Sequence, residues 1–350
     1  MTPPAKTSSA EWNVAVRAYL QEACSLESAA PLKQLVSLDE DVWLVERADG
    51  ATLVAKHQPF GMLTQGQAYD LLSVEQEVLA LLNAAACPVP RVLGVDRATQ
   101  FIFFSYCGPQ TLDDVVYQQG VSARLGYLPQ IIDGLKSIEA VCLDQVVDLQ
   151  RLVAPALSKK ELDAAWHQCG KRAHQGLAAL AANAKLTTDA EARLGRWLEL
   201  VLAWLGSRQP VLGCSDYRAA NLVIEPTSRT LSFIEFAKIG WDWTERRLVQ
   251  YTSTTGAGRR QGGFRSLLDA AAVRYAVLDL DKARALDYHY RVYWLNVAAL
   301  LGQALQQPAD ALLVKAWSAS AHRWRQLMRL LARVLADDPL AHAFSREFTA

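Results

Sequence analysis

The sequence predicts an α+β protein in which strands and helices occupy separate stretches of the chain. Turn residues between apolar positions indicate strands over residues 42–57 and 101–104, and again within 211–236. Apolar residues at three-to-four spacing, with few helix breakers, indicate helices through 122–206 and 264–336. A chain of 350 residues has room for one large domain or for two lobes.

The composition argues against several classes of protein. The 36 basic and 36 acidic residues cancel, which disfavours a general binder of nucleic acid. No apolar run reaches the roughly 18 residues that a membrane-spanning helix needs, and the first residues, MTPPAKTSSAEW, lack the apolar core of a signal peptide. The 6 cysteines form no CxxC pair, which predicts reduced thiols in a cytoplasmic protein without membrane or nucleic-acid partners.

Residues 1–34 are interpreted as an N-terminal helical extension. A helix is predicted over 8–30, because apolar residues recur on one face there: Trp12, Val16, Leu20 and Cys24. A hairpin follows over 42–57, with an Asp-Gly turn signal at Asp49–Gly50. Its second strand ends close to Lys56, which is a candidate functional cation.

A helix is predicted over residues 66–86 from its apolar side, which runs from Leu71 to Leu82. Glu75 and Glu77 on this helix are both candidates to form an ion pair with Lys56.

The stretch 211–236 carries the chemistry. A short strand leads into a polar loop that holds Asp216 and Arg218, and Asn221 then opens a hairpin that ends at Glu235. Two carboxylates and a carboxamide are thereby brought to one end of a tight hairpin. Mg²⁺ prefers such oxygen ligands, and a separate carboxylate can orient a hydroxyl.

The order Asp216–x₄–Asn221 followed by Ile234–Glu235–Phe236 resembles the catalytic loop and metal-binding segment of aminoglycoside phosphotransferase and choline kinase-like proteins. Their pattern is roughly H-G-D-x-x-x-x-N and then I-D-F/W, whereas here Cys214–Ser215 precede the Asp and Glu replaces the second Asp. The resemblance implies the bilobal protein-kinase-like fold. It assigns residues 35–107 to a small β-rich N-lobe and 108–350 to a large, mainly helical C-lobe.

The resemblance also implies roles for the N-lobe residues. Lys56 would hold the α- and β-phosphates of ATP. Glu75 would brace Lys56, because family members place a Glu thirteen residues before a Pro-x-Pro segment, here Pro88–Val89–Pro90. The hinge between the lobes, where backbone groups meet the adenine, would comprise Ser105, Tyr106 and Cys107.

In the C-lobe the resemblance implies that Asp216 receives or orients the proton of an attacking hydroxyl. Arg218 would stabilise charge on the transferred phosphate. Asn221 and Glu235 would bind Mg²⁺. The implied activity is ATP- and Mg²⁺-dependent transfer of the γ-phosphate to a hydroxyl of a small molecule. Glu245 is the nearest counterpart of the family's Asp that holds the catalytic loop in place.

Departures from the family pattern motivate an alternative. The loop Ser37–Asp41 carries three acids and no glycine, and Glu235 reaches about 1.5 Å further than Asp would. The alternative is a degenerate, pseudokinase-like module that binds a ligand or partner. An unrelated helical binding protein with a chance match is the third hypothesis.

The charges near the hairpin bear on the substrate. Basic residues offset Asp242 and Glu245 in the segments after Glu235 and favour a neutral or anionic metabolite over a polycation: Lys238, Arg246, Arg247, Arg259 and Arg260. The segment 252–263 is interpreted either as a flexible connection or as a substrate lid.

Overall fold

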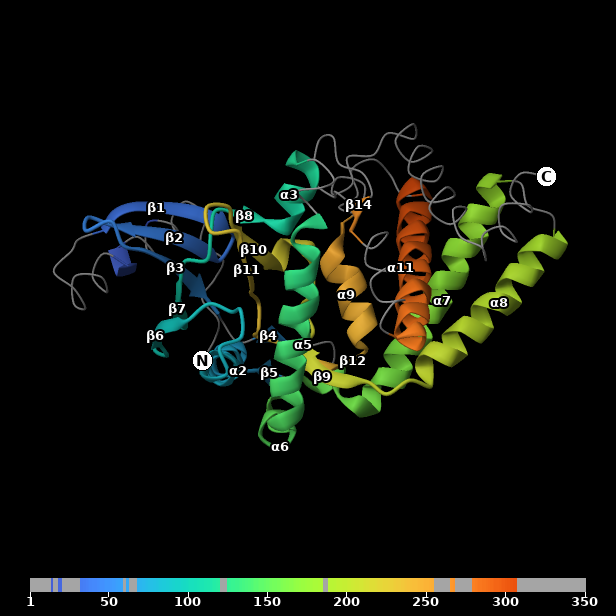
Figure 1. Ribbon diagram of the computed structural model, residues 1–350, viewed down its shortest axis with the longest axis horizontal. Coiled ribbons are helices and arrows are strands. Elements are labelled where there is room, and N and C mark those ends of the chain that lie inside the picture. Colours follow the sequence, from blue (N-terminus) through green and yellow to red (C-terminus); the bar gives the residue numbers. More distant parts are fainter. Residues whose placement is uncertain are drawn as a thin grey trace.

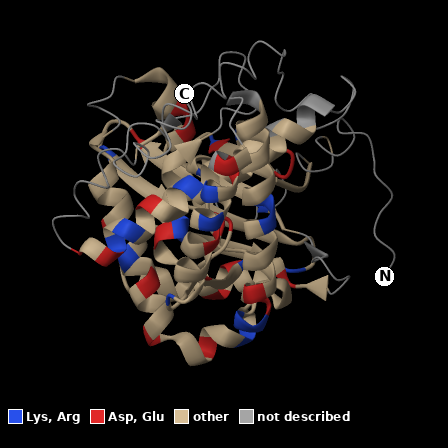
Figure 2. Ribbon diagram, turned by 90° about the vertical axis from the view of Figure 1, so that its right-hand side faces the viewer, with Lys and Arg blue, Asp and Glu red and all other residues tan. Residues whose placement is uncertain are grey.

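The computed structural model describes residues 14, 18–20, 32–58, 61–62, 68–119, 125–184, 188–254, 265–267 and 279–306. A β-rich lobe lies on one side and a helical lobe on the other (Figure 1), so the predicted bilobal α+β architecture is confirmed. No helix among these residues is both long and apolar enough to span a membrane. Seen from the helical lobe, basic and acidic residues are intermixed (Figure 2).

The N-lobe is built on a five-stranded antiparallel sheet with the order β1-β2-β3-β7-β6. Its strands are β1 (Leu32–Asp39), β2 (Val42–Arg47), β3 (Thr52–His57), β6 (Val92–Asp96) and β7 (Phe101–Ser105). A two-stranded ribbon of β4 (Gly61–Met62) and β5 (Ala68–Tyr69) and the helix α2 (Leu71–Ala84) complete the lobe.

Both faces of this sheet are covered, as the alternation along β7 shows. Ile102 and Phe104 belong to the core shared with α2, whereas Phe101 packs with Leu20 on the opposite face. Tyr19 stacks on Phe101, with 4.8 Å between ring centroids, and its hydroxyl donates to Asp96. The described residues of the N-terminal extension therefore cover the outer face of the sheet. The remainder of the helix predicted over 8–30 lies outside the described residues.

The C-lobe combines long helices with the central hairpin. Its elements up to the hairpin are β8 (Gln110–Thr111), α3 (Leu112–Gln118), α5 (Leu128–Asp144), α6 (Val146–Leu149), η1 (Gln150–Leu152), η2 (Pro155–Leu157), α7 (Lys159–Ala184), α8 (Thr188–Gly206) and β9 (Val211–Cys214). The remaining elements are η3 (Ala219–Asn221), β10 (Leu222–Glu225), β11 (Thr230–Phe233), β12 (Ile239–Asp242), α9 (Thr244–Thr252), β13 (Ser253–Thr254), β14 (Arg265–Ser266) and α11 (Leu280–Gln306).

In the part of the chain that the structure describes, the sequence interpretation missed the strands β1, β6 and β12, the helix α9 and the two-residue strands β4, β5, β8, β13 and β14. β1 and β6 are antiparallel partners of neighbouring strands, β12 pairs with β9, and α9 follows β12 directly. The helix α2 begins at Leu71 rather than near residue 66, because the Asp70 side chain accepts from the backbone N–H of Ser73 and caps it.

The hairpin β10–β11 meets the hinge at Gly108. This residue has φ +140°, and any Cβ there would collide with the backbone of Ile224. β8 pairs with β10 immediately after this glycine. The hinge is thereby fixed against the hairpin that carries the candidate functional residues.

Candidate functional site

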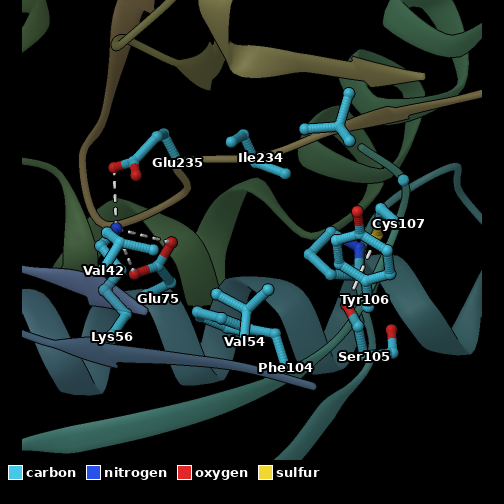
Figure 3. Close-up of a pocket in the computed structure, with 13 residues that line it drawn as sticks. Val42, Val54, Lys56, Glu75, Phe104, Ser105, Tyr106, Cys107, Ile234 and Glu235 are labelled. Atoms are coloured by element: carbon cyan, nitrogen blue, oxygen red, sulfur yellow. Dashed lines mark hydrogen bonds and ion pairs between the residues drawn. The ribbon is translucent and has the colours of Figure 1, made fainter. Parts of the chain in front are cut away.

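A cleft of about 490 Å³ lies between the lobes (Figure 3). Apolar side chains from both lobes form its walls, among them Val42, Val54 and Ile234. One end is formed by the predicted hinge residues Ser105, Tyr106 and Cys107, and the other by Lys56, Glu75 and Glu235. The cleft thus has an apolar middle, one end at the predicted hinge and one charged end.

The charged end is a cluster of three residues, Lys56, Glu75 and Glu235, which we call the lysine cluster. The Lys56 Nζ lies 3.1 Å from Glu75 Oε2 and 2.8 Å from Glu235 Oε2. Strand β3 supplies the lysine, helix α2 supplies Glu75, and Glu235 follows strand β11. The side chains of Lys56 and Glu75 are 9% and 2% exposed, but Glu235 is 27% exposed and faces the cleft. Glu77, the other candidate, lies instead against Arg151.

Burial and charge oppose each other in this cluster. Burial would lower the pKa of Lys56, but the charges of Glu75 and Glu235 outweigh it and raise that pKa above its ordinary value. Burial raises the pKa of Glu75, and the nearby charge of Lys56 acts in the opposite direction. Lys56 is therefore a permanent cation at the end of the cleft.

Glu75 also connects the N-lobe to the hairpin. Its Oε1 accepts from the backbone N–H of Phe236 at 3.1 Å, and its Oε2 accepts from Gln58 Nε2 at 2.7 Å. Glu235, the residue before Phe236, has φ +69°, a conformation that costs energy for a residue with a Cβ. The buried Cys214 thiol donates to the Glu235 carbonyl at 3.1 Å. These bonds hold Glu235 in its unusual conformation.

The catalytic loop predicted from the sequence brings Asp216, Arg218 and Asn221 together. The Asn221 Nδ2 donates to the backbone oxygen of Asp216 at 2.7 Å, while Arg218 donates to both carboxylate oxygens of Asp216 at 3.0 and 3.3 Å. The Ile234 N–H donates to the Asn221 carbonyl at 3.0 Å, which ties this loop to the strand before Glu235. Arg218 is 67% exposed and Asp216 24%, so the pair borders solvent.

Below this loop lies a buried arrangement that the sequence did not predict, which we call the arginine clamp. Arg247 on α9 is fully buried, and its Nη1 lies 2.8 Å from Glu139 Oε1 on α5. Its other donors bind three backbone carbonyls at 2.9–3.0 Å, those of Val211, Cys214 and Gly240. The clamp therefore fixes the strand that leads into the catalytic loop.

Asp242 secures the same loop from another side. It accepts a hydrogen bond from the Tyr217 hydroxyl, and both its carboxylate oxygens accept from Arg246 Nη1 at 2.9 and 3.1 Å. Burial would raise the pKa of Asp242, but the charges of Arg246 and Arg247 lower it below its ordinary value. Asp242 is consequently ionised across the physiological range.

Two interpretations of the sequence change with these contacts. The side chains that hold the catalytic loop are Arg247 and Asp242, rather than Glu245. The sequence places Arg246 and Arg247 among the basic residues that favour a neutral or anionic substrate, but in the structure both are bound within this framework. In the sequence, Arg246 and Arg247 follow Trp241 and Trp243 in an apolar helical pattern. This pattern does not distinguish a buried arginine from an exposed one.

The acidic loop predicted before the first hairpin is the turn between β1 and β2. One carboxylate oxygen of Asp39 accepts from the N–H of Glu40 at 2.8 Å, so this acid is engaged by its own turn. Asp39 and Glu40 are exposed. Arg259 and Arg260, the proposed lid residues, lie outside the described residues.

The donor set is compatible with nucleotide and Mg²⁺. Asn221 uses its amide nitrogen within the loop, which leaves its side-chain oxygen for a further partner. Mg²⁺ is usually held by one or two protein oxygens together with phosphates and waters. Asn221 and Glu235 would supply two such protein oxygens. Among the described residues, no cluster of three or more His, Cys, Asp or Glu could hold a metal ion.

Comparison with solved structures agrees on the fold. The GDP complex of wild-type aminoglycoside 2'-phosphotransferase-IIIa has a TM-score of 0.52 at 14% identity, over 90% of this chain and 97% of that one. The GDP and kanamycin complex of the related APH(2")-IIIa has a TM-score of 0.50 at 12% identity, over 92% and 99%. A choline/ethanolamine kinase family protein from Mesorhizobium loti matches at 0.43 and 14%, over 96% and 98%, which is too loose to support an argument.

A scan against family models and a search of curated proteins found no match. The chain has the bilobal fold of the aminoglycoside phosphotransferases, as the resemblance in sequence implied.

Proposed function

We propose that the protein is an ATP- and Mg²⁺-dependent phosphotransferase, related to the aminoglycoside phosphotransferases and choline kinase-like proteins, that transfers the γ-phosphate to a hydroxyl of a small molecule. The observation that supports this most is the lysine cluster. A buried lysine is held between carboxylates from both lobes, at the end of a cleft whose other end is the hinge. The aminoglycoside phosphotransferase structures compared above contain GDP, and one also contains kanamycin.

In this proposal the cleft binds the nucleotide along its length. The apolar walls and the hinge backbone at Ser105–Cys107 take the base, which places the phosphates at Lys56. Lys56 holds the α- and β-phosphates, and Glu75 fixes its ammonium in position. Mg²⁺ neutralises phosphate charge when it is bound, and Asn221 and Glu235 are the residues that hold it.

The acceptor hydroxyl is oriented by Asp216, which receives its proton as the new oxygen–phosphorus bond forms. The bond between the γ-phosphorus and the β–γ bridging oxygen breaks in the same step, and ADP leaves. A positioned base of this kind typically contributes about 10²–10⁴-fold to the rate. Arg218 turns away from one carboxylate oxygen of Asp216 and contacts the transferred phosphate instead. Its guanidinium is exposed, so it can turn without disturbing the core. Together these residues position the reactants and neutralise charge, which is most of what phosphoryl transfer requires.

A thermal-shift titration with ATP, with and without Mg²⁺, tests the nucleotide site. A ligand at about 100 times its dissociation constant adds about 2.7 kcal/mol to stability. We expect a shift that needs Mg²⁺ and that Asn221→Ala weakens. The absence of any shift with ATP, with or without Mg²⁺, would refute nucleotide binding.

Turnover tests the transfer itself. With a panel of sugars, amino alcohols and aminoglycosides as acceptors, Asp216→Asn should abolish ADP formation and leave ATP binding largely intact. Asp133→Asn, which changes an exposed acid on α5, is the matched control. Full activity in Asp216→Asn would contradict the proposed role.

A second candidate is a nucleotide-binding module without turnover. The contacts that favour it are those that occupy the two functional carboxylates, Lys56 on Glu235 and Arg218 on Asp216. ADP formation that is lost in Asn221→Ala would rule this candidate out.

We assign the reaction to the cytoplasm. The cysteines that the structure describes are free thiols, which fits a reducing compartment: Cys87, Cys107, Cys142, Cys169 and Cys214. The partner in this proposal is a small molecule, with no role for nucleic acid or a membrane.

A further inference from the structure

A second cavity in the helical lobe is lined by residues of α7, α9 and α11. Figure 1 shows where these three helices lie. The volume of the cavity is about 810 Å³, including the part that is open to solvent, and it is larger than the cleft between the lobes. None of the proposed catalytic, metal or nucleotide residues lines it. Apolar groups such as Val292 and Val297 form part of the wall, and six polar side chains share it: Gln168, Arg172, Arg246, Gln250, His289 and Asn296.

His289 presents an unpaired polar atom in this wall. The residue is 2% exposed, and its Nε2 has no hydrogen-bond partner. The ring packs between Trp166 and Trp243, with centroids 5.6 and 5.7 Å away. Burial lowers the pKa of His289 to about 3, and the charge of Arg246 acts in the same direction. A buried polar atom without a partner costs about 1–3 kcal/mol, which a ligand in the cavity could relieve.

The charge in the cavity is positive. Its lining contains two arginines and no Asp or Glu. Arg246 is already bound to Asp242, but Arg172 forms no ion pair with any described residue. Both guanidinium groups lie close enough to Cys169 to oppose the effect of burial, which raises the pKa of that thiol. Because Asp242 neutralises Arg246, the excess positive charge at the cavity comes from Arg172, and a ligand that carries negative charge fits it best.

We propose that this cavity is a binding site for a small organic anion, a carboxylate or phosphate ester with an apolar body. Arg172 at the rim binds the anionic group, and the apolar wall of α11 takes the body. The lining apolar groups disfavour a bare inorganic ion, and the absence of lining acids disfavours a cation.

The site is also connected to the catalytic loop. Arg246 lines the cavity and binds Asp242, and Asp242 accepts from the hydroxyl of Tyr217, which adjoins Asp216. A ligand that draws Arg246 toward the cavity would compete with Asp242 for its donors. The proposal does not depend on phosphotransferase activity, because binding can be measured without nucleotide.

Calorimetric titration of the full chain with benzoate and with phenyl phosphate tests the site. Benzamide, which has the shape of benzoate without its charge, is the neutral control. We expect saturable binding of at least one anion and none of benzamide. Arg172→Gln should weaken that binding by about tenfold or more, because a charge-assisted hydrogen bond is lost.

Lys171→Gln is the matched control variant, since Lys171 is the exposed neighbour of Arg172 on α7 and does not line the cavity. It should bind the anion as the wild type does. Asp216→Asn should also retain this binding, which separates the site from the proposed transfer. Three results would each overturn the proposal: neither anion binds, benzamide binds equally well, or Arg172→Gln binds as tightly as the wild type.

Discussion

The lysine cluster and the arginine clamp both pair a buried cation with at least one carboxylate, yet they differ in what surrounds them. Lys56 and its partners come from both lobes, and Glu235 is 27% exposed to the cleft. Arg247 is 0% exposed, and its partners all lie in the C-lobe. The cluster can therefore exchange a partner for a ligand, whereas the clamp cannot.

This difference separates support of the catalytic loop, which we assign to the clamp, from contact with a ligand, which we assign to the cluster. The clamp holds the backbone on which the catalytic loop is built, so changes there should act on folding. The cluster faces the space that a nucleotide would occupy, so changes there should depend on pH and on ligands. The predictions below test this separation.

The largest effect is expected from Arg247→Met. The substitution leaves the Glu139 carboxylate and three backbone carbonyls without their donor, and breaking such a buried pair typically costs about 3–5 kcal/mol. Urea denaturation measures the loss. Arg218→Met, which removes an exposed arginine, should change stability little.

If Arg247→Met fails to fold, Glu139→Gln/Arg247→Met keeps the prediction testable. Removal of both charges eliminates the uncompensated carboxylate, so the double variant should be more stable than Arg247→Met alone. A double variant that is less stable would mean that the clamp acts through its carbonyl bonds only.

The next effect concerns His289, which is buried behind Arg246. The unfolded chain binds a proton near pH 6.5, whereas folded His289 binds one only near pH 3. Because the folded-state pKa is depressed, stability is retained above pH 6.5 and falls as the pH drops toward 3, by about 1.4 kcal/mol per unit from this group. Between pH 6.5 and 4.5 the stability of His289→Phe should decline less than that of the wild type.

Urea denaturation at a series of pH values, in buffers without carboxylates, measures this slope. His167→Asn on α7 is the control, since it changes an exposed histidine. Equal slopes in wild type and His289→Phe would show that His289 takes up its proton in the folded protein.

In the lysine cluster, Lys56→Met is expected to cost about 1–3 kcal/mol at pH 8, because Glu75 becomes a buried carboxylate without a cation. Burial already raises the pKa of Glu75, and loss of Lys56 removes the charge that opposes this rise. A raised folded-state pKa means that stability is full below the ordinary value of 4.5 and is lost as the pH rises. The variant should therefore lose less stability at pH 5 than at pH 8.

Denaturation of Lys56→Met and Lys56→Met/Glu75→Gln at both pH values measures this effect. The double variant lacks the titrating carboxylate, so its loss should vary less with pH. A single variant whose loss is the same at pH 5 and pH 8 would contradict a buried, ionised Glu75.

Much of this architecture could be predicted from the sequence, because local signals carry it. The hinge, the hairpin β2–β3 and the Asp216–Asn221 loop are marked by turn residues and by residue order. The Pro-x-Pro spacing selected Glu75 over Glu77, and the structure places Glu75 against Lys56.

The rest depends on contacts between residues distant in sequence. Glu139 and Arg247 are 108 residues apart, and a polar residue on an amphipathic helix does not reveal whether a distant partner buries it. Strands β1, β6 and β12 lack strong turn signals, and their pairing is set by neighbouring strands. The six polar residues of the helical cavity come from three helices, so no single stretch of sequence indicates the cavity.

The smallest effect is expected from Glu235→Asp, which restores the residue that the family pattern carries. The shorter side chain withdraws from Lys56, but Glu75 still lies 3.1 Å from the Lys56 ammonium. Since Glu235 is the most exposed member of the cluster, the loss should be below about 1 kcal/mol in urea denaturation. When the ATP thermal shift is measured at increasing Mg²⁺ concentrations, the variant should need the same concentration as the wild type or a lower one. The reason is that the released carboxylate no longer has Lys56 as a partner. A loss of several kcal/mol would mean that Glu235 holds the lobes together, and the contrast between the cluster and the clamp would then fail.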